Sequence, residues 1–133
     1  MEDPTAFIRS SMPLCETLGI RAEALAPDEV VLELDWTAEL CTAGGLLHGG
    51  ALMALADSAG AACAYLNLPS GASGTATIES KTNFLRGVRD GIVTAIARPL
   101  HVGSGTVVVE TELRNGGHLV AKVTQTQAVV GDR

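Results

Sequence analysis

The chain has 133 residues, of which 47% are apolar, and its formal net charge is −6. This length allows one domain with its own hydrophobic core. The acidic balance argues against nucleic acid as a partner, because no surface that could neutralise phosphates is evident.

The number and spacing of the cysteines and the N-terminal sequence indicate the cellular compartment of the protein. Three cysteines, an odd number, lie far apart and form no Cys-x-x-Cys pair. That spacing is typical of a reducing compartment and argues against structural zinc. Residues 1–11 lack the basic and then apolar layout of a secretory signal. We therefore expect a single cytoplasmic domain over residues 1–133.

The N-terminal third predicts one helix and one hairpin. Residues 3–17 are expected to form a short helix, with Asp3 as the N-cap and Pro4 at the first helical position. In the stretch EVVLELDW, residues 29–36, apolar and charged side chains alternate, which predicts a strand. Residues 20–26 are its expected hairpin partner, turning at the Pro-Asp pair between them.

An Ala-rich segment, residues 48–66, predicts one long helix that ends before an Asn-Leu-Pro sequence. About 18 of these residues are apolar enough to resemble a membrane span, but Asp57 lies in the middle. A charge there costs roughly 2.5–3.5 kcal/mol on insertion scales, and Ala and Gly offset little of it. The segment therefore predicts a buried helix, not a membrane span.

Four strands are expected after this helix, over residues 75–85, 92–100, 106–114 and 118–130. Turn sequences containing Gly separate them, and such short connections predict an antiparallel meander. A helix without a polar stripe must be covered, and a sheet curled around it is the economical solution. The predicted fold class is α+β, with an antiparallel sheet wrapped around one long central helix.

Two motifs give this element order a family resemblance. HGGALMALAD opens the predicted helix and KTNFLRG lies in the following strand. Over roughly residues 15–130, the chain resembles the hotdog-fold acyl-CoA thioesterases of the PaaI-like type, named after phenylacetic acid degradation. The resemblance implies a hydrolase that cleaves aryl- or medium-chain acyl-CoA to the free acid and CoA. It needs no metal and no cofactor beyond the CoA of the substrate.

The resemblance also implies roles for individual residues. Asp57, nine residues after the His of the HGG motif, corresponds to the carboxylate that acts as nucleophile or general base. Gly49 corresponds to the backbone N–H that polarises the thioester carbonyl, with His48 as its neighbour. Thr77 matches a Ser or Thr that holds the attacking water. Because Asp57 lies among Ala and Leu, we expect it to be incompletely hydrated and reactive as an anion.

Substrate-binding candidates lie on both sides of the predicted helix. Gly50 follows the oxyanion position, and Thr42 stands where relatives often have an Asn. The segment SKTNFLRGVR, residues 80–89, carries Lys81, Arg86, Arg89 and no acid, which predicts a phosphate-binding patch for CoA. The turn at residues 102–105 lacks the basic residues that relatives often carry there.

Helix geometry predicts an oligomer. Gly49 and Asp57 are about 12 Å apart along one helix axis, at 1.5 Å per residue. A nucleophile and an oxyanion donor must both lie roughly 3 Å from one reacting group. The two residues therefore come from different subunits, which makes a homodimer the smallest active unit. The family resemblance further implies a homotetramer.

Other interpretations compete with this one. A mid-helix Asp is usually hydrated or bonded to a neighbour, the glycines could serve a plain turn, and the cations could be solvated surface charges. The main alternative function is a non-catalytic hotdog protein that binds an acyl group or another small ligand. A hydratase would need a catalytic Asp–His pair, but His48 and Asp57 lie in neither the same nor an adjacent turn.

Overall fold

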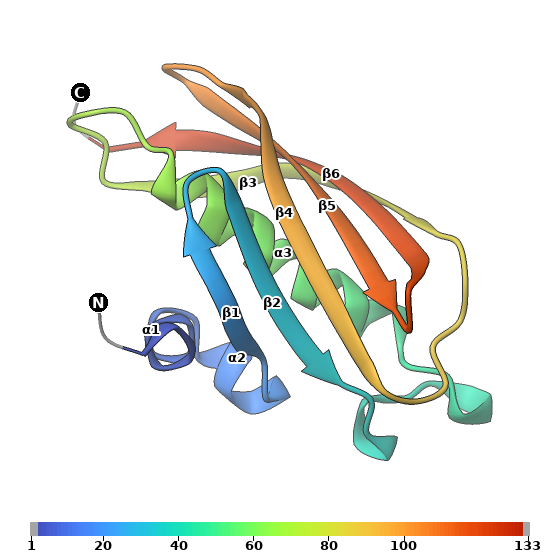
Figure 1. The fold of residues 1–133 in the computed structure, drawn as a ribbon. Coiled ribbons are helices and arrows are strands. Elements are labelled where there is room, and N and C mark those ends of the chain that lie inside the picture. Colours follow the sequence, from blue (N-terminus) through green and yellow to red (C-terminus); the bar gives the residue numbers. More distant parts are fainter. Residues whose placement is uncertain (1–2, 132–133) are drawn as a thin grey trace.

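The computed structural model describes residues 3–131. Six strands form one antiparallel sheet that curves around the long helix α3 (Figure 1). The helices are α1 (Pro4–Ser11), α2 (Pro13–Leu18) and α3 (Gly49–Leu66), with two short 3₁₀ turns, Ala38–Leu40 and Ala43–Gly45, before α3. The strands are β1 (Arg21–Ala26), β2 (Glu29–Asp35), β3 (Gly74–Phe84), β4 (Ile92–Val102), β5 (Thr106–Asn115) and β6 (His118–Val130).

The predicted N-terminal helix is in fact two helices. Asp3 caps α1 as expected, since its side chain accepts a hydrogen bond from the N–H of Thr5 at 3.0 Å. The prediction of one continuous helix over residues 3–17 is wrong because Pro13 interrupts it. Met12 before this proline has the non-helical dihedrals φ −130° and ψ 89°, as steric contact with the proline ring requires.

The sheet confirms six antiparallel strands but corrects their order. The four C-terminal strands were expected to form a simple meander, whereas the order across the sheet is β1-β2-β4-β5-β6-β3. Only β4, β5 and β6 form a meander, and β3 pairs with β6 at the far edge. The segment 85–91 is therefore a connection across the end of the sheet, not a hairpin turn.

The two edges of the sheet are protected to different degrees. Helix α1 covers the β1 edge, where the N–H of Ala22 donates to Thr5 Oγ1 at 3.0 Å and Arg9 Nε donates to the carbonyl of Ile20 at 2.9 Å. At the opposite edge, β3 has no further strand beside it among residues 3–131. Ile78 and Phe84 on this strand are 61% and 51% exposed. An open strand edge of this length, with two exposed apolar side chains, is a surface for pairing with another strand.

Helix α3 contributes much of the core. Its buried side packs against the sheet through residues that include Leu52, Leu55, Ala59 and Cys63. Burial raises the pKa of the Cys63 thiol to about 11, and the nearby Asp28 carboxylate adds to the shift. Cys63 therefore stays a neutral core thiol near pH 7.

Cys63 gives the protein an alkaline limit to its stability. Its folded-state pKa of about 11 lies above the ordinary value of 9.0, so between these values the unfolded chain loses a proton that the folded protein keeps. The free energy of unfolding then falls as pH rises through this window, by ~1.4 kcal/mol per unit of pKa difference. Chemical denaturation at pH 8, 9.5 and 11 should show this fall in the wild type and a smaller one in Cys63→Ala. Equal slopes in both would contradict the assignment.

Candidate active site

The start of α3 carries one unpaired backbone N–H. His48 is the N-cap, and its Nδ1 accepts a hydrogen bond from the N–H of Gly50 at 2.7 Å. The N–H of Gly49 has no hydrogen-bond partner within residues 3–131. The first N–H groups of a helix carry partial positive charge and need an outside acceptor. Gly49, and not Gly50, therefore has an N–H that is free to bind a carbonyl oxygen.

Asp57 stands two turns further along α3, at the border between its sheet-facing side and its exposed side. Its Oδ1 accepts hydrogen bonds from Gln125 Nε2 at 3.2 Å and from Thr77 Oγ1 at 3.5 Å. Its Oδ2 has no partner in the described part of the chain. The side chain is exposed in the single chain, so the expectation of an incompletely hydrated carboxylate is wrong for the chain by itself. Only a further surface placed over α3 could remove that water.

Thr77 on β3 faces Asp57 on α3, although the two are far apart in sequence. Thr77 also accepts a hydrogen bond from Gln127 Nε2 at 2.7 Å. Gln125 and Gln127 were not singled out from the sequence. Little in the sequence indicates that these glutamines are buried. Lys and Thr alternate with them in β6, so either side of the strand could have faced solvent.

Three other residues predicted for the site lie in the loop before α3 or in the segment that packs on it. Thr42 is exposed in the loop before α3, and its N–H donates to the carbonyl of Leu46 at 2.8 Å. Arg86 lies 3.3 Å from His118 Nδ1, and Arg89 donates to the carbonyl of Gly44 at 3.5 Å. Both belong to the segment 85–91, which packs on the loop preceding α3.

Lys81 lies on a different face from Asp57. It pairs in register with Thr124, and two residues earlier Glu79 accepts a hydrogen bond from Thr126 on the outer side of β6. Because side chains two apart in a strand share a face, Lys81 points to the outer face of the sheet. The structure therefore does not group all three predicted cations around the start of α3.

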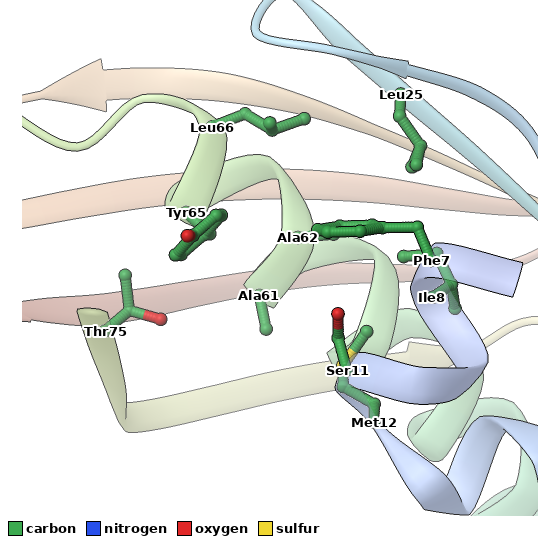
Figure 2. Close-up of a pocket in the computed structure, with 10 residues that line it drawn as sticks. All are labelled: Phe7, Ile8, Ser11, Met12, Leu25, Ala61, Ala62, Tyr65, Leu66 and Thr75. Atoms are coloured by element: carbon green, nitrogen blue, oxygen red, sulfur yellow. The ribbon is translucent and has the colours of Figure 1, made fainter. Parts of the chain in front are cut away.

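An apolar cavity of about 380 Å³ lies between α1 and the C-terminal half of α3 (Figure 2). Ala61, one helical turn after Asp57, and Thr75, two residues before Thr77, form part of its wall. Figure 2 shows the Phe7 side chain reaching from α1 toward α3. The remaining lining residues are Ile8, Ser11, Met12, Leu25, Ala62, Tyr65 and Leu66.

The described residues contain no group of three or more His, Cys, Asp or Glu side chains arranged to hold a metal ion. Gly49 and Asp57 belong to one unbroken helix. In a single chain, the Gly49 N–H and the Asp57 carboxylate are therefore too far apart along the helix to contact the same carbonyl group.

Comparison with known proteins places this arrangement in a family. Residues 44–122, which include the HGG motif, Asp57 and Thr77, match the Thioesterase superfamily. The chain belongs to the thioesterase superfamily. This thioesterase is 37% identical over 98 residues to PA1618 of Pseudomonas aeruginosa, covering 74% of this chain and 68% of the relative. It is 33% identical over 96 residues to the 1,4-dihydroxy-2-naphthoyl-CoA hydrolase of Escherichia coli, covering 72% and 70%.

Solved structures agree with this assignment. A crystal structure of a mutant of thioesterase PA1618 superposes with a TM-score of 0.88 at 31% identity, over 98% of this chain and 96% of that one. A mutant of the phenylacetic acid degradation protein PaaI from Thermus thermophilus gives 0.82 at 30% identity, over 89% and 99%. The predicted hotdog fold, the PaaI-like resemblance and the thioesterase class are confirmed. Helix α3, although long and apolar enough to cross a membrane, is the core helix of this soluble fold.

Proposed function

We propose that this thioesterase hydrolyses an aryl- or medium-chain acyl-CoA to the free acid and CoA. The observation that carries the proposal is the Asp57 carboxylate, whose Oδ1 is held by Thr77 and Gln125 while Oδ2 is left open. The relative from Escherichia coli, whose name gives an aryl-CoA substrate, supports the CoA thioester class. Acyl-CoA hydrolysis followed by free-thiol detection over aryl and C4–C16 acyl-CoAs tests it directly.

The proposed reaction centre is shared by two subunits. A second copy that pairs along the open β3 edge would extend the sheet and cover the exposed side of α3. Met53 and Tyr65 on that side are 42% and 51% exposed in the single chain, so their burial would favour such a dimer. Across a two-fold axis, Asp57 of one subunit can then approach Gly49 of the other. The homodimer is the proposed active unit and a homotetramer the proposed assembly, in the cytoplasm.

The chemistry follows from these groups. The Gly49 N–H binds the thioester oxygen and stabilises the negative charge that develops on it. Asp57 Oδ2 either attacks the carbonyl carbon itself or removes a proton from the water that attacks it. The C–S bond then breaks, and CoA leaves as the thiol after taking up a proton. If a water attacked, the free acid forms in this step, and Asp57 gives up the proton it removed. If Asp57 attacked, the acyl group is left on its carboxylate as a mixed anhydride, which a water then hydrolyses to the free acid and the regenerated carboxylate. Thr77 Oγ1 retains a lone pair for the attacking water, and His48 holds the helix start in place through Gly50.

The apolar cavity is the proposed acyl site. It begins one turn beyond Asp57, and Tyr65 lies about 12 Å from Asp57 along α3 at 1.5 Å per residue. An acyl group bound at the carbonyl would therefore run along the helix into a cavity of about 380 Å³. This size and lining accommodate an aryl ring or a medium-length chain and favour apolar groups over charged ones.

The cations without an acidic partner in the described chain are the proposed CoA-binding residues, with Arg86 and Arg89 beside the loop before α3 and Lys81 only for a part of CoA that reaches the outer face of the sheet. Arg133 lies outside the described residues, and five of the other eight Lys and Arg side chains form ion pairs. The three without an acidic partner among residues 3–131 are Lys81, Arg86 and Arg89, the same three predicted from the sequence. Free cations in a protein of net charge −6 are suited to the phosphates of CoA. Gly50 and Thr42, beside the helix start, are proposed to contact the pantetheine end.

Removing one of these cations should weaken substrate binding without slowing the chemistry. Arg86→Ala and Arg89→Ala are each expected to raise KM for acyl-CoA roughly two- to fivefold, as for an exposed charge pair, with kcat unchanged. Arg98→Ala is the matched control, because it removes the same charge from a residue already paired with Glu29 at 2.7 Å. An equal KM change in the control would show a general charge effect and no phosphate site.

A non-catalytic acyl-binding protein is the second candidate. Thr42 in place of the usual Asn and the uncharged turn at residues 102–105 favour it. The same acyl-CoA panel separates the two functions. Saturable binding without release of free thiol would support the binder, and turnover that depends on Asp57 would support the enzyme.

A further inference from the structure

Two buried glutamines lie on the inner face of β6, where other inward positions are apolar. Gln125 and Gln127 are 0% and 1% exposed, between Val123 and Val129, which are also buried. Burying an amide is unfavourable unless hydrogen bonds compensate it. Valine or leucine would serve a purely structural role here at least as well. Amides at both positions therefore point to a task beyond filling the core.

Both amides direct their N–H groups toward the proposed active site. Gln125 Nε2 donates to Asp57 Oδ1 at 3.2 Å, and Gln127 Nε2 donates to Thr77 Oγ1 at 2.7 Å. Since Thr77 Oγ1 accepts this bond, its own hydroxyl proton is left for Asp57 Oδ1, 3.5 Å away. Two donors thus converge on Oδ1 from the sheet, while Oδ2 remains open.

The backbone of α3 makes room for this contact at Gly60. A Cβ atom at position 60 would overlap the amide of Gln125, so any other residue there would displace it. Gln125 Oε1 is buried without a hydrogen-bond partner in the described residues. Turning the amide round would place this oxygen against the negative carboxylate of Asp57. The observed orientation therefore gives Asp57 a hydrogen-bond donor, although it leaves Gln125 Oε1 without a partner in the described residues.

We propose that Gln125 and Gln127 are positioning residues that hold the Asp57 carboxylate in one orientation, with Oδ1 anchored to the sheet and Oδ2 presented to the substrate. Gln125 acts directly and Gln127 acts through Thr77. Neither residue reaches the substrate. The inference rests on the proposed function, in which Asp57 acts on a thioester.

The primary test replaces each amide by an apolar side chain of similar length. Gln125→Met is expected to lower kcat on the order of 10²-fold, the effect of a misplaced reacting group, with KM within about twofold of wild type. Gln127→Met should lower kcat less, because it acts through Thr77. The melting temperature should not fall in either variant, since a buried amide is removed. Thr124→Val, on the outer face of the same strand, should leave kcat unchanged.

A coupling experiment tests the same contact from the other side. Gly60→Ala should displace the Gln125 amide and lower kcat, whereas in a Gln125→Ala background the same substitution should have little further effect. Such non-additivity is expected only if Gly60 acts through Gln125. Additive losses would overturn the proposal.

The outcomes separate this inference from the proposed function. Wild-type turnover together with unchanged kcat in Gln125→Met would overturn the positioning role and leave the thioesterase proposal standing. A kcat loss that is accompanied by an equal change in KM and a lower melting temperature would assign Gln125 a structural role only. A wild-type protein inactive toward every acyl-CoA would overturn the proposed function, and the positioning role with it.

Discussion

The Asp57→Asn variant is expected to lose thioesterase activity on the order of 10³-fold in kcat while keeping its fold. The substitution removes the negative charge and replaces Oδ2, the oxygen without a partner in the described chain. An Asn side chain still offers an oxygen to Gln125 Nε2 and to Thr77 Oγ1, which now lie 3.2 and 3.5 Å from Oδ1. The hydrogen-bond network can therefore persist without the chemistry.

Stability measurements accompany this test. Asp57 is exposed in the single chain, and surface substitutions usually change stability by less than about 0.5 kcal/mol. Equal melting temperatures with unequal turnover would assign the loss to the reaction itself. Full turnover in Asp57→Asn, measured by thiol release under saturating acyl-CoA, would remove Asp57 from the mechanism even if the protein remained a thioesterase.

Two inactive variants are expected to restore activity when they are combined in one dimer. Gly49→Pro removes the backbone N–H proposed to bind the thioester oxygen, at a cost of about 10²–10³ in kcat. Proline is tolerated at the first helical position, and the extended His48, with φ −63° and ψ 134°, suits a residue before proline. Gly49→Ala keeps the N–H and adds a Cβ against the Phe84 ring, so it controls for crowding.

The mixed dimer distinguishes a shared site from a site within one chain. In a heterodimer of Asp57→Asn and Gly49→Pro, one site combines the intact Asp57 of one subunit with the intact Gly49 of the other, and the second site lacks both. Purified through two different tags, this dimer should regain about half of the wild-type activity, because one of two sites is intact. A heterodimer no more active than its parents would show that Asp57 and Gly49 do not act across the interface.

The sequence by itself determined the local elements of this protein. The alternation in EVVLELDW, the Ala-rich run around Asp57 and the Gly-containing turns predicted strands, one core helix and an antiparallel sheet, because periodicity and turn chemistry act within a few residues. The single local error, one helix in place of α1 and α2, came from Pro13, whose effect on Met12 was not given enough weight.

The HGG motif and Asp57 could likewise be read from the sequence, and so could their separation along α3, since helix rise is fixed. The sequence could not show that His48 Nδ1 accepts a hydrogen bond from the N–H of Gly50 and leaves the N–H of Gly49 without a partner within residues 3–131. A side chain and a backbone group two residues apart form such a bond only in one particular cap conformation.

Tertiary structure alone decided which strand borders the site. Strand β3 pairs with β6 and not with its neighbour in sequence, β4, and this pairing brings Thr77 beside Gln127 and sends Lys81 to the outer face. Strand partners and register are set by which faces can be buried together over the whole sheet, and no short stretch of sequence contains that information. For the same reason, the amides that hold Asp57 became visible only once β6 was placed against α3.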